Sequence, residues 1–106
     1  MKIETSGQKA VVIPEGRIDI KDSKELKGKA QELLNEGCCE MTVDFSQVTG
    51  IDSSGIGVLL LMQKKFQESG GVFKVIKVTS KNIQKIFKMM QIHKVINIEQ
   101  EDVTSV

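Results

Sequence analysis

Short apolar segments alternate with longer amphipathic ones along the whole chain, and this alternation limits the folds open to it. Strand-like runs occupy residues 2–6, 9–14, 40–45, 72–78 and 95–98. Helical spacing of apolar residues lies between them. Only Gly7-Gln8 separates the first two runs, which predicts a hairpin, whereas the later helical crossovers favour parallel pairing. We therefore predict one α/β domain of ββαβαβαβ order, with a mixed, mostly parallel sheet of about four to five strands and helices largely on one side.

The boundaries of the first helix are predicted from residues that favour helix ends. Asp22 is followed by Glu25 three residues later, which is the spacing of a capping box, and Ser23 is an alternative cap. Gly37 supplies a residue suited to the left-handed conformation that often ends a helix. The first helix is therefore expected over residues 22–36.

Two further helices are predicted in the second half of the chain. Residues 46–50 contain turn-forming residues and are expected to form a loop before a helix over residues 53–69, whose first half is apolar almost all round. Thr79 or Ser80 is expected to cap a third helix. The polar tail, residues 99–106, is expected to fray.

Composition excludes several classes of function. The 106 residues carry a formal charge of +1, with no Trp and no Tyr, which argues against direct nucleic-acid binding. No apolar run approaches the roughly 20 residues of a membrane span, and no signal peptide is evident, so a cytoplasmic protein is expected. Cys38, Cys39 and His93 do not suffice for a zinc site, so neither metal nor cofactor is expected.

The segment Asp52-Ser53-Ser54-Gly55 places two hydroxyl groups at the start of the second predicted helix. Free backbone N–H groups and the positive end of the helix dipole favour an added phosphate there, while Asp52 or Ser53 can equally serve as a simple helix cap. A phosphate-binding loop motif and the GxSxG motif of hydrolases are both absent. The one histidine, His93, lies far along the chain, so a nucleophile is not favoured.

Residues 43–60, VDFSQVTGIDSSGIGVLL, resemble the central motif of bacterial anti-sigma factor antagonists, which belong to the STAS domain family. The family motif is an apolar strand, Asp or Asn, a short loop, then Asp-Ser-Ser/Ala-Gly-apolar-Gly and an aliphatic helix. Residues 16–19, Gly-Arg-Ile-Asp, resemble the family's Gly-x-Leu-Asp turn after the second strand. The order of elements also agrees, so the resemblance implies a single STAS domain over residues 1–106.

The resemblance implies a switch protein rather than an enzyme. In the family, the residue directly after the motif Asp is phosphorylated by a partner that is both anti-sigma factor and serine kinase, and that position here is Ser53. The unphosphorylated form binds this partner and releases a sigma factor, and phosphate abolishes the binding. A serine phosphatase and a monomer or weak dimer are expected as well. The expected partner-binding residues are Asp19, Asp52, Ser53, Ser54, Gly55 and Ile56.

Some roles within this site stay open at the level of sequence. Asp19 is either a contact in a second loop or only a cap or turn residue, and Ser54 is either a minor phosphate acceptor or a cap. The same motif also suits a STAS domain outside sigma-factor control: a stressosome-like scaffold, a lipid-transport accessory subunit, or a regulator of another kinase–phosphatase pair. A small hydrolase or nucleotide-binding protein is the enzymatic alternative.

Charge is unevenly distributed along the chain. Residues 64–94 contain eight Lys and one acidic residue, whereas the first 52 residues carry ten acidic ones. The serine segment is therefore expected to lie on a comparatively acidic side that suits a basic partner. Lys81, Lys85 and Lys88 either form a solvated helix face or attract an acidic partner or a membrane surface.

Overall fold

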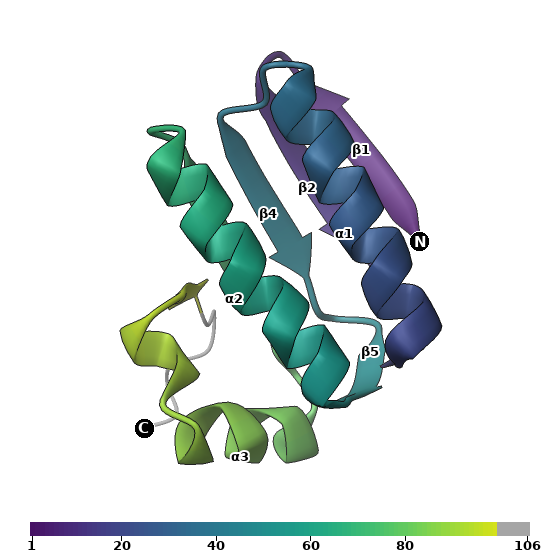
Figure 1. The fold of residues 1–106 in the computed structure, drawn as a ribbon. Helices are drawn as coiled ribbons and strands as arrows, with labels where there is room; N and C mark the ends of the chain where they lie inside the picture. Colours follow the sequence, from purple (N-terminus) through teal and green to yellow (C-terminus); the bar gives the residue numbers. More distant parts are fainter. Residues whose placement is uncertain (100–106) are drawn as a thin grey trace.

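The computed structural model describes residues 1–99. The elements follow in the order β1 (Lys2–Ser6), β2 (Lys9–Ile13), β3 (Gly16–Ile18), α1 (Ile20–Asn35), β4 (Glu40–Asp44), β5 (Val48–Ile51), α2 (Ser53–Glu68), β6 (Val72–Ile76), α3 (Lys81–Met89), the 3₁₀ helix η1 (Ile92–Lys94) and β7 (Asn97–Glu99). Helices α1 and α2 lie side by side over one face of the strands, and α3 lies near the start of α2 (Figure 1).

The main sheet has five strands in the order β1-β2-β4-β6-β7. Strands β1 and β2 form the predicted antiparallel hairpin, and the turn between them uses Gly7 with φ +61°. Strands β2, β4, β6 and β7 all pair in parallel. The predicted α/β class, the mixed and mostly parallel sheet and the one-sided helices are therefore confirmed.

Two short strands that the sequence pattern did not reveal form a second, smaller sheet. Strand β3 pairs in parallel with β5, which occupies most of the segment expected to be a loop at residues 46–50. Strands of three and four residues are too short to show a two-residue period. Their pairing brings the starts of α1 and α2 together, because each strand leads directly into a helix.

The core lies between the main sheet and the two long helices. Alternate residues of β4 and β6, namely Met41, Val43, Phe73 and Val75, are buried on the helix side. Helix α2 contributes Leu59, Met62 and Phe66, and α1 contributes Leu26, Ala30 and Leu33. The expectation that the apolar first half of α2 lies buried is only partly met, because Val58, Leu60 and Leu61 are half-buried.

The start of α1 differs from the sequence-based prediction. Asp19 is the N-cap and accepts a hydrogen bond from the backbone N–H of Asp22 at 3.0 Å, so the helix begins at Ile20 rather than near residue 22. The capping-box assignment to Asp22 with Glu25, and the alternative assignment to Ser23, are wrong because β3 ends immediately before Asp19. Gly37, with φ +90°, follows the end of α1 as predicted.

The other predicted boundaries hold to within a few residues. Ser80 caps α3 by accepting a hydrogen bond from the backbone N–H of Ile83 at 3.3 Å. The last strand is β7 rather than residues 95–98, because η1 takes up the chain just before it. Glu99 belongs to β7, so the tail begins later than predicted, and residues 100–106 lie outside the described part.

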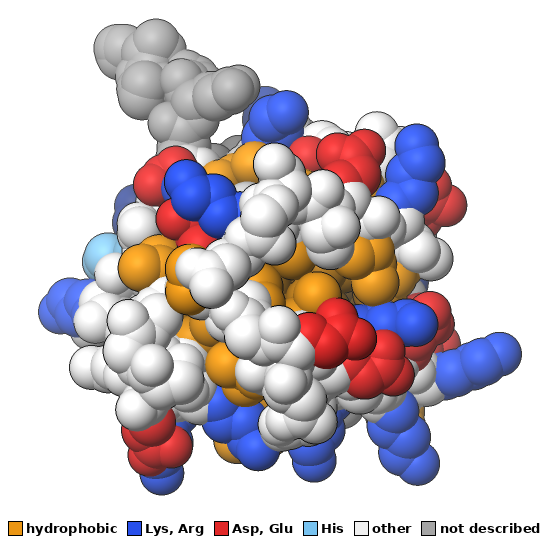
Figure 2. Space-filling model, turned by 90° about the horizontal axis from the view of Figure 1, so that it is seen from above, with side chains coloured by type: hydrophobic (Ala, Val, Ile, Leu, Met, Phe, Trp, Pro, Cys, Tyr) orange, Lys and Arg blue, Asp and Glu red, His pale blue; other side chains and the backbone are white. Residues whose placement is uncertain are grey.

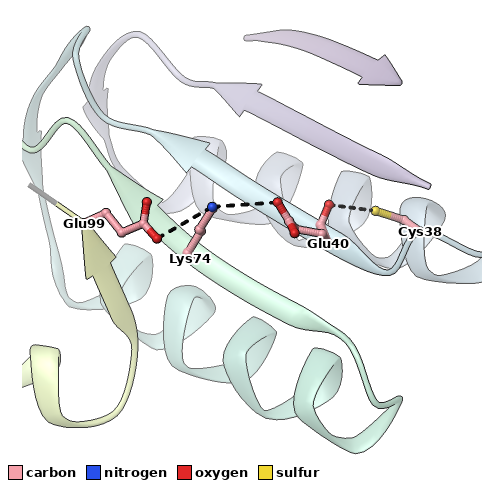
Figure 3. A network of polar contacts seen from close by, with 4 residues as sticks. All are labelled: Cys38, Glu40, Lys74 and Glu99. Carbon is pink, nitrogen blue, oxygen red and sulfur yellow. Dashed lines mark hydrogen bonds and ion pairs between the residues drawn. The ribbon is translucent and has the colours of Figure 1, made fainter. Parts of the chain in front are cut away.

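The face of the main sheet that the helices leave open carries a polar network (Figure 3). Lys74 Nζ on β6 lies 3.7 Å from a carboxylate oxygen of Glu40 on β4 and 3.6 Å from one of Glu99 on β7. The thiol of Cys38 donates to the backbone carbonyl of Glu40 at 3.3 Å. These contacts tie three neighbouring strands together on this face.

The end of the molecule that holds the β1–β2 turn shows apolar side chains among charged ones (Figure 2). A hollow of about 130 Å³ lies there, and its apolar lining comes from Ala10, Leu33 and Cys38. Burial raises the pKa of the Cys38 thiol, which favours its protonated form. This end is opposite to the end where α1 and α2 begin (Figure 1).

Candidate functional site

The serine segment lies where two equivalent strand-to-helix turns meet. Ile18 at the end of β3 and Ile51 at the end of β5 are register partners, and each is followed by an aspartate that caps a helix. The backbone N–H of Asp52 donates to the carbonyl of Ile18 at 3.3 Å. Asp19 and Asp52 are thereby held side by side, although 33 positions separate them in sequence.

Asp52 is the more heavily bonded of the two caps. One of its carboxylate oxygens accepts from the backbone N–H groups of Ser54 at 3.0 Å and Gly55 at 3.2 Å. The same oxygen accepts a short hydrogen bond from the Ser54 hydroxyl. The helix dipole and these donors favour the negatively charged carboxylate at this position.

Ser54 links the two helices. Its Oγ lies 3.1 Å from Oγ of Ser23, which is a buried residue of α1. Ser54 therefore interacts both with the cap of its own helix and with the neighbouring helix, and its side chain is half-buried. The helix cap is Asp52 and not Ser54 or Ser53.

Gly55 allows the start of α2 to press against the small sheet. A Cβ at this position would lie 2.7 Å from Cγ1 of Ile51 and 3.0 Å from Cγ2 of Ile18. Gly57 differs, because a Cβ there would meet open space. Ile56 is only 6 % exposed and belongs to the core, so its side chain does not form part of the accessible surface.

Ser53 and Ile20 hold equivalent, exposed positions in the two turns. Each is the first residue of its helix, and each follows one of the capping aspartates. No side-chain hydrogen bond of Ser53 is present within residues 1–99, and Ile20 is 62 % exposed. A shallow hollow of about 510 Å³ lies between the turns and is lined by Asp19, Ile20, Lys21, Lys24 and Asp52.

Both aspartates are more acidic than an ordinary aspartate. The hydrogen bond from the Ser54 side chain, followed by those from the backbone of Gly55 and Ser54, lowers the pKa of Asp52 against the opposing effect of desolvation. The positive charge of Arg17 adds to this lowering of the Asp52 pKa. The backbone N–H of Asp22 is the main cause that lowers the pKa of Asp19.

The charge around the hollow is mixed rather than predominantly acidic. Lys21 and Lys24 line it together with the two aspartates. The Arg17 side chain lies across Gly50, since a Cβ on Gly50 would come within 2.9 Å of its guanidinium. The sequence-based expectation of a comparatively acidic side therefore has to include these three basic residues.

The structure brings together most residues that the sequence singled out. Asp19, Asp52, Ser53, Ser54 and Gly55 all lie at the paired turns, whereas Ile56 points into the core. Sequence reasoning missed Ile20 and Ser23 as members of this site. Their positions depend on where β3 ends and on how α1 packs on α2, and neither is visible in the local pattern.

The arrangement offers no partner for a serine nucleophile. His93 lies in η1 and lines a different hollow, together with Val78, Gln84, Phe87, Lys88 and Ile98. No cluster of three or more His, Cys, Asp or Glu side chains suited to a metal ion occurs among residues 1–99. Within the same part of the chain, no helix is long and apolar enough to cross a membrane.

Comparison with known proteins identifies the family. The family model described as "Mlab, STAS domain" matches residues 1–98, and the chain belongs to the STAS domain family. This agrees with the resemblance carried by residues 43–60 and 16–19 and with the observed order of strands and helices.

Several solved structures share the fold at low sequence identity. TM1081 of Thermotoga maritima, provisionally assigned as an anti-sigma factor antagonist, has a TM-score of 0.85 and 18 % identity over 97 % of this chain and 87 % of that one. The phosphorylated form of the Bacillus cell fate determinant SpoIIAA has a TM-score of 0.74 and 18 % identity, over 94 % and 91 %. An anti-sigma factor antagonist from Mycobacterium paratuberculosis has a TM-score of 0.76 and 18 % identity, over 92 % and 81 %.

Proposed function

We propose that this protein is an anti-sigma factor antagonist that acts in the cytoplasm by switching partners. Its unphosphorylated form binds an anti-sigma factor that is also a serine kinase, and this binding releases a sigma factor. Phosphorylation of Ser53 ends the binding, and a serine phosphatase restores it. The observation that carries the proposal is the exposed Ser53 hydroxyl at the first position of a firmly capped helix, beside the exposed Ile20.

The difference between the two serines supports Ser53 as the phosphate acceptor. The Ser54 hydroxyl is engaged by Asp52 and lies against Ser23, so its modification would break its contacts with both side chains. Ser53 is exposed and makes no such contact within the described residues. A kinase can reach Ser53 without any change in the fold.

The effect of a phosphate on binding follows from local charge. A phosphoserine adds a charge of about −1.5 to −2 at neutral pH. At Ser53 this charge would stand next to the Asp52 carboxylate, whose lowered pKa keeps it ionised. A partner surface complementary to Ile20 and the two aspartates would then meet both repulsion and a large desolvation cost.

Ile20 supplies the apolar part of the proposed docking face. Apolar side chains near the centre of an interface often contribute much of the binding free energy. Ile20 borders the hollow that also contains Asp19 and Asp52, and it is the exposed large apolar residue of this end of α1. We therefore assign Asp19, Ile20, Asp52 and Ser53 to the contact with the kinase, with Ser54, Gly55 and Ile56 supporting their positions from below.

The test is a binding experiment in cells of the source organism. Unphosphorylated protein and the Ser53→Asp variant serve as baits, with Ser6→Asp on the exposed strand β1 as the charge-matched control. The proposal predicts that wild type and Ser6→Asp retain a serine kinase that also binds a sigma factor, and that Ser53→Asp does not. With the purified kinase, Ile20→Ala should weaken binding by about tenfold, because an interface apolar side chain is lost.

Equal retention of the kinase by wild type and Ser53→Asp would contradict the switch. Retention of a different complex, with no sigma-binding kinase, would favour the second candidate function. That candidate is a scaffold or accessory subunit outside sigma-factor control: a stressosome-like assembly, a lipid transporter or another partner-switching pair. One observation favours it, namely that the matching family model is described as Mlab and not as an anti-sigma factor antagonist.

A further inference from the structure

Exposed apolar side chains gather where α3 meets η1. Among the large apolar residues that are exposed in residues 1–99, three lie between positions 89 and 95. Met89 is 73 % exposed, Met90 is 53 % exposed and Val95 is 56 % exposed. Single exposed apolar residues are common on protein surfaces, so it is the grouping of these three that needs an explanation.

The backbone explains why these side chains point outward. Helix α3 ends at Met89, and the left-handed conformation of Gln91, with φ +54°, turns the chain sharply into η1. Ile92 and Ile96 are buried after this turn and hold it against the core. Met89, Met90 and Val95 are left on the outside of a corner that projects at the edge of the molecule (Figure 1).

Exposed lysines lie on both elements that meet at this corner. Lys81, Lys85 and Lys88 are exposed on the face of α3 opposite its buried residues Ile83 and Phe87, and Lys94 is exposed in η1. The segment from residue 69 to residue 98 contains no Asp or Glu. We call Lys81, Lys85, Lys88, Met89, Met90, Lys94 and Val95 together the α3–η1 corner.

The lysines of the α3–η1 corner differ from those of the neighbouring sheet. Lys74 lies within salt-bridge distance of Glu40 and Glu99, and Lys77 lies 3.9 Å from the Asp44 carboxylate. Within the described part of the chain, the four lysines of the corner have no carboxylate partner. Their charge is therefore available to an external anionic surface.

We propose that the α3–η1 corner binds the surface of an anionic lipid bilayer. The lysines would lie among the anionic headgroups, and the two methionines and Val95 would enter the boundary between headgroups and acyl chains. This proposal does not depend on the function proposed for Ser53, since the residues involved are different.

The shape and size of the corner favour a bilayer over an acidic protein. Three of its cations lie along the exposed face of α3 and one lies in η1, and a fluid array of headgroups can match such a spread without fixed geometry. A stable protein interface buries about 800 Å² on each partner around a packed apolar centre. Three exposed apolar side chains on a projecting turn provide too little surface for such a centre.

Sedimentation of the purified protein with lipid vesicles tests the proposal. We expect binding to phosphatidylglycerol vesicles, weak or no binding to phosphatidylcholine vesicles, and loss of binding as salt is raised. The triple variant Lys81→Gln/Lys85→Gln/Lys88→Gln should bind phosphatidylglycerol vesicles about 100-fold more weakly, at roughly fivefold per lysine. The double variant Met89→Ser/Met90→Ser should lose at least about tenfold, because buried apolar area is removed.

Matched variants on other faces control for net charge and for apolar content. Lys2→Gln/Lys9→Gln/Lys27→Gln removes three exposed lysines elsewhere, and Val72→Ser removes an exposed apolar residue of β6. Both should bind like wild type. The proposal is overturned if wild type does not bind phosphatidylglycerol vesicles, or if the lysine controls weaken binding as much as the corner variants. It is also overturned if the methionines instead mediate self-association in the absence of lipid.

Discussion

Helices α1 and α2 begin in the same way, yet their first turns differ in how firmly they are held. Each follows an Ile-Asp pair at the end of a short parallel strand, and each aspartate caps its helix with extended backbone angles. Asp52 accepts three hydrogen bonds, whereas Asp19 accepts one. The α2 turn is a fixed platform that presents Ser53, and the α1 turn presents an exposed apolar side chain, Ile20, at the equivalent position.

This difference indicates how a phosphate could act as a switch without refolding the domain. The backbone around Ser53 is held by Asp52, by the Ser54–Ser23 contact and by the close packing of Gly55. A charge added there would change the proposed docking face and leave the fold intact. Four substitution or pH experiments test whether the two turns differ as the structure indicates.

The largest expected effect is at Gly55. Gly55→Ala places a methyl group 2.7 Å from Ile51, and the resulting strain should outweigh the gain in helix propensity, lowering the free energy of unfolding by about 1–2 kcal/mol. Gly57→Ala is the matched control, because the same change meets open space and should raise stability by about 0.5–1 kcal/mol. Urea unfolding measures both. If both substitutions changed the free energy of unfolding equally, the close packing of Gly55 against Ile51 and Ile18 would be contradicted.

The second-largest expected effect is the difference in stability between substitutions of the two helix caps. Asp52→Ala removes three accepted hydrogen bonds and should lower Tm by about 8 °C, whereas Asp19→Ala removes one and should lower it by about 4 °C. Thermal unfolding followed by circular dichroism is the measurement. A larger loss for Asp19→Ala would reverse the comparison between the turns.

The paired turns could be predicted from the sequence only in part. The hairpin, the long helices, the parallel order and the motif residues Asp52 to Gly55 follow from apolar period and turn chemistry. Strands β3 and β5 do not, because each is too short to show a period and is stabilised mainly by the other. Because β3 was not predicted, the N-cap of α1 was predicted at Asp22 and not at Asp19.

The contacts between the turns were not predictable for a related reason. The Ser23–Ser54 contact joins residues 31 positions apart and depends on how α1 packs against α2. The motif placed Ile56 among the partner-binding residues, but its helical phase puts it in the core once α2 lies against the sheet. Ile20 lies outside the motif, and its exposure emerges only from the fold.

Both turns should contribute less to the stability of the fold as pH falls. The pKa of Asp19 and that of Asp52 are lowered in the folded protein, so their contribution to stability is present above the unfolded-state pKa of about 3.9 and is lost as pH falls below it. Asp52→Asn should therefore show a smaller loss of stability than wild type between pH of about 5 and 2. Ser54→Ala should reduce this loss partly, because the Ser54 side chain is the main cause of the lowered pKa. The measurement is the urea midpoint as a function of pH. Parallel curves for wild type, Asp52→Asn and Ser54→Ala would contradict the cause assigned to the lowered Asp52 pKa.

The smallest expected effect is the coupling between the turns. A double-mutant cycle of Ser23→Ala and Ser54→Ala should give a coupling free energy of about 0.5–1 kcal/mol, the usual value of one hydrogen bond. Ser69→Ala in place of Ser23→Ala is the control, since Ser69 bonds only at the far end of α2. Additive effects of Ser23→Ala and Ser54→Ala would mean that the two hydroxyls do not interact.

The most direct test of the central claim is to map phosphate on the protein recovered from its own cells. Intact mass and peptide mapping across growth, starvation and stress would identify the modified residue, with a Ser53→Ala strain as control. We expect one phosphate, on Ser53 and not on Ser54, with an occupancy that changes with growth condition. A Ser53 that stays unmodified under all conditions, or a phosphate on Ser54 instead, would contradict it and leave the α2 turn as a constitutive docking face.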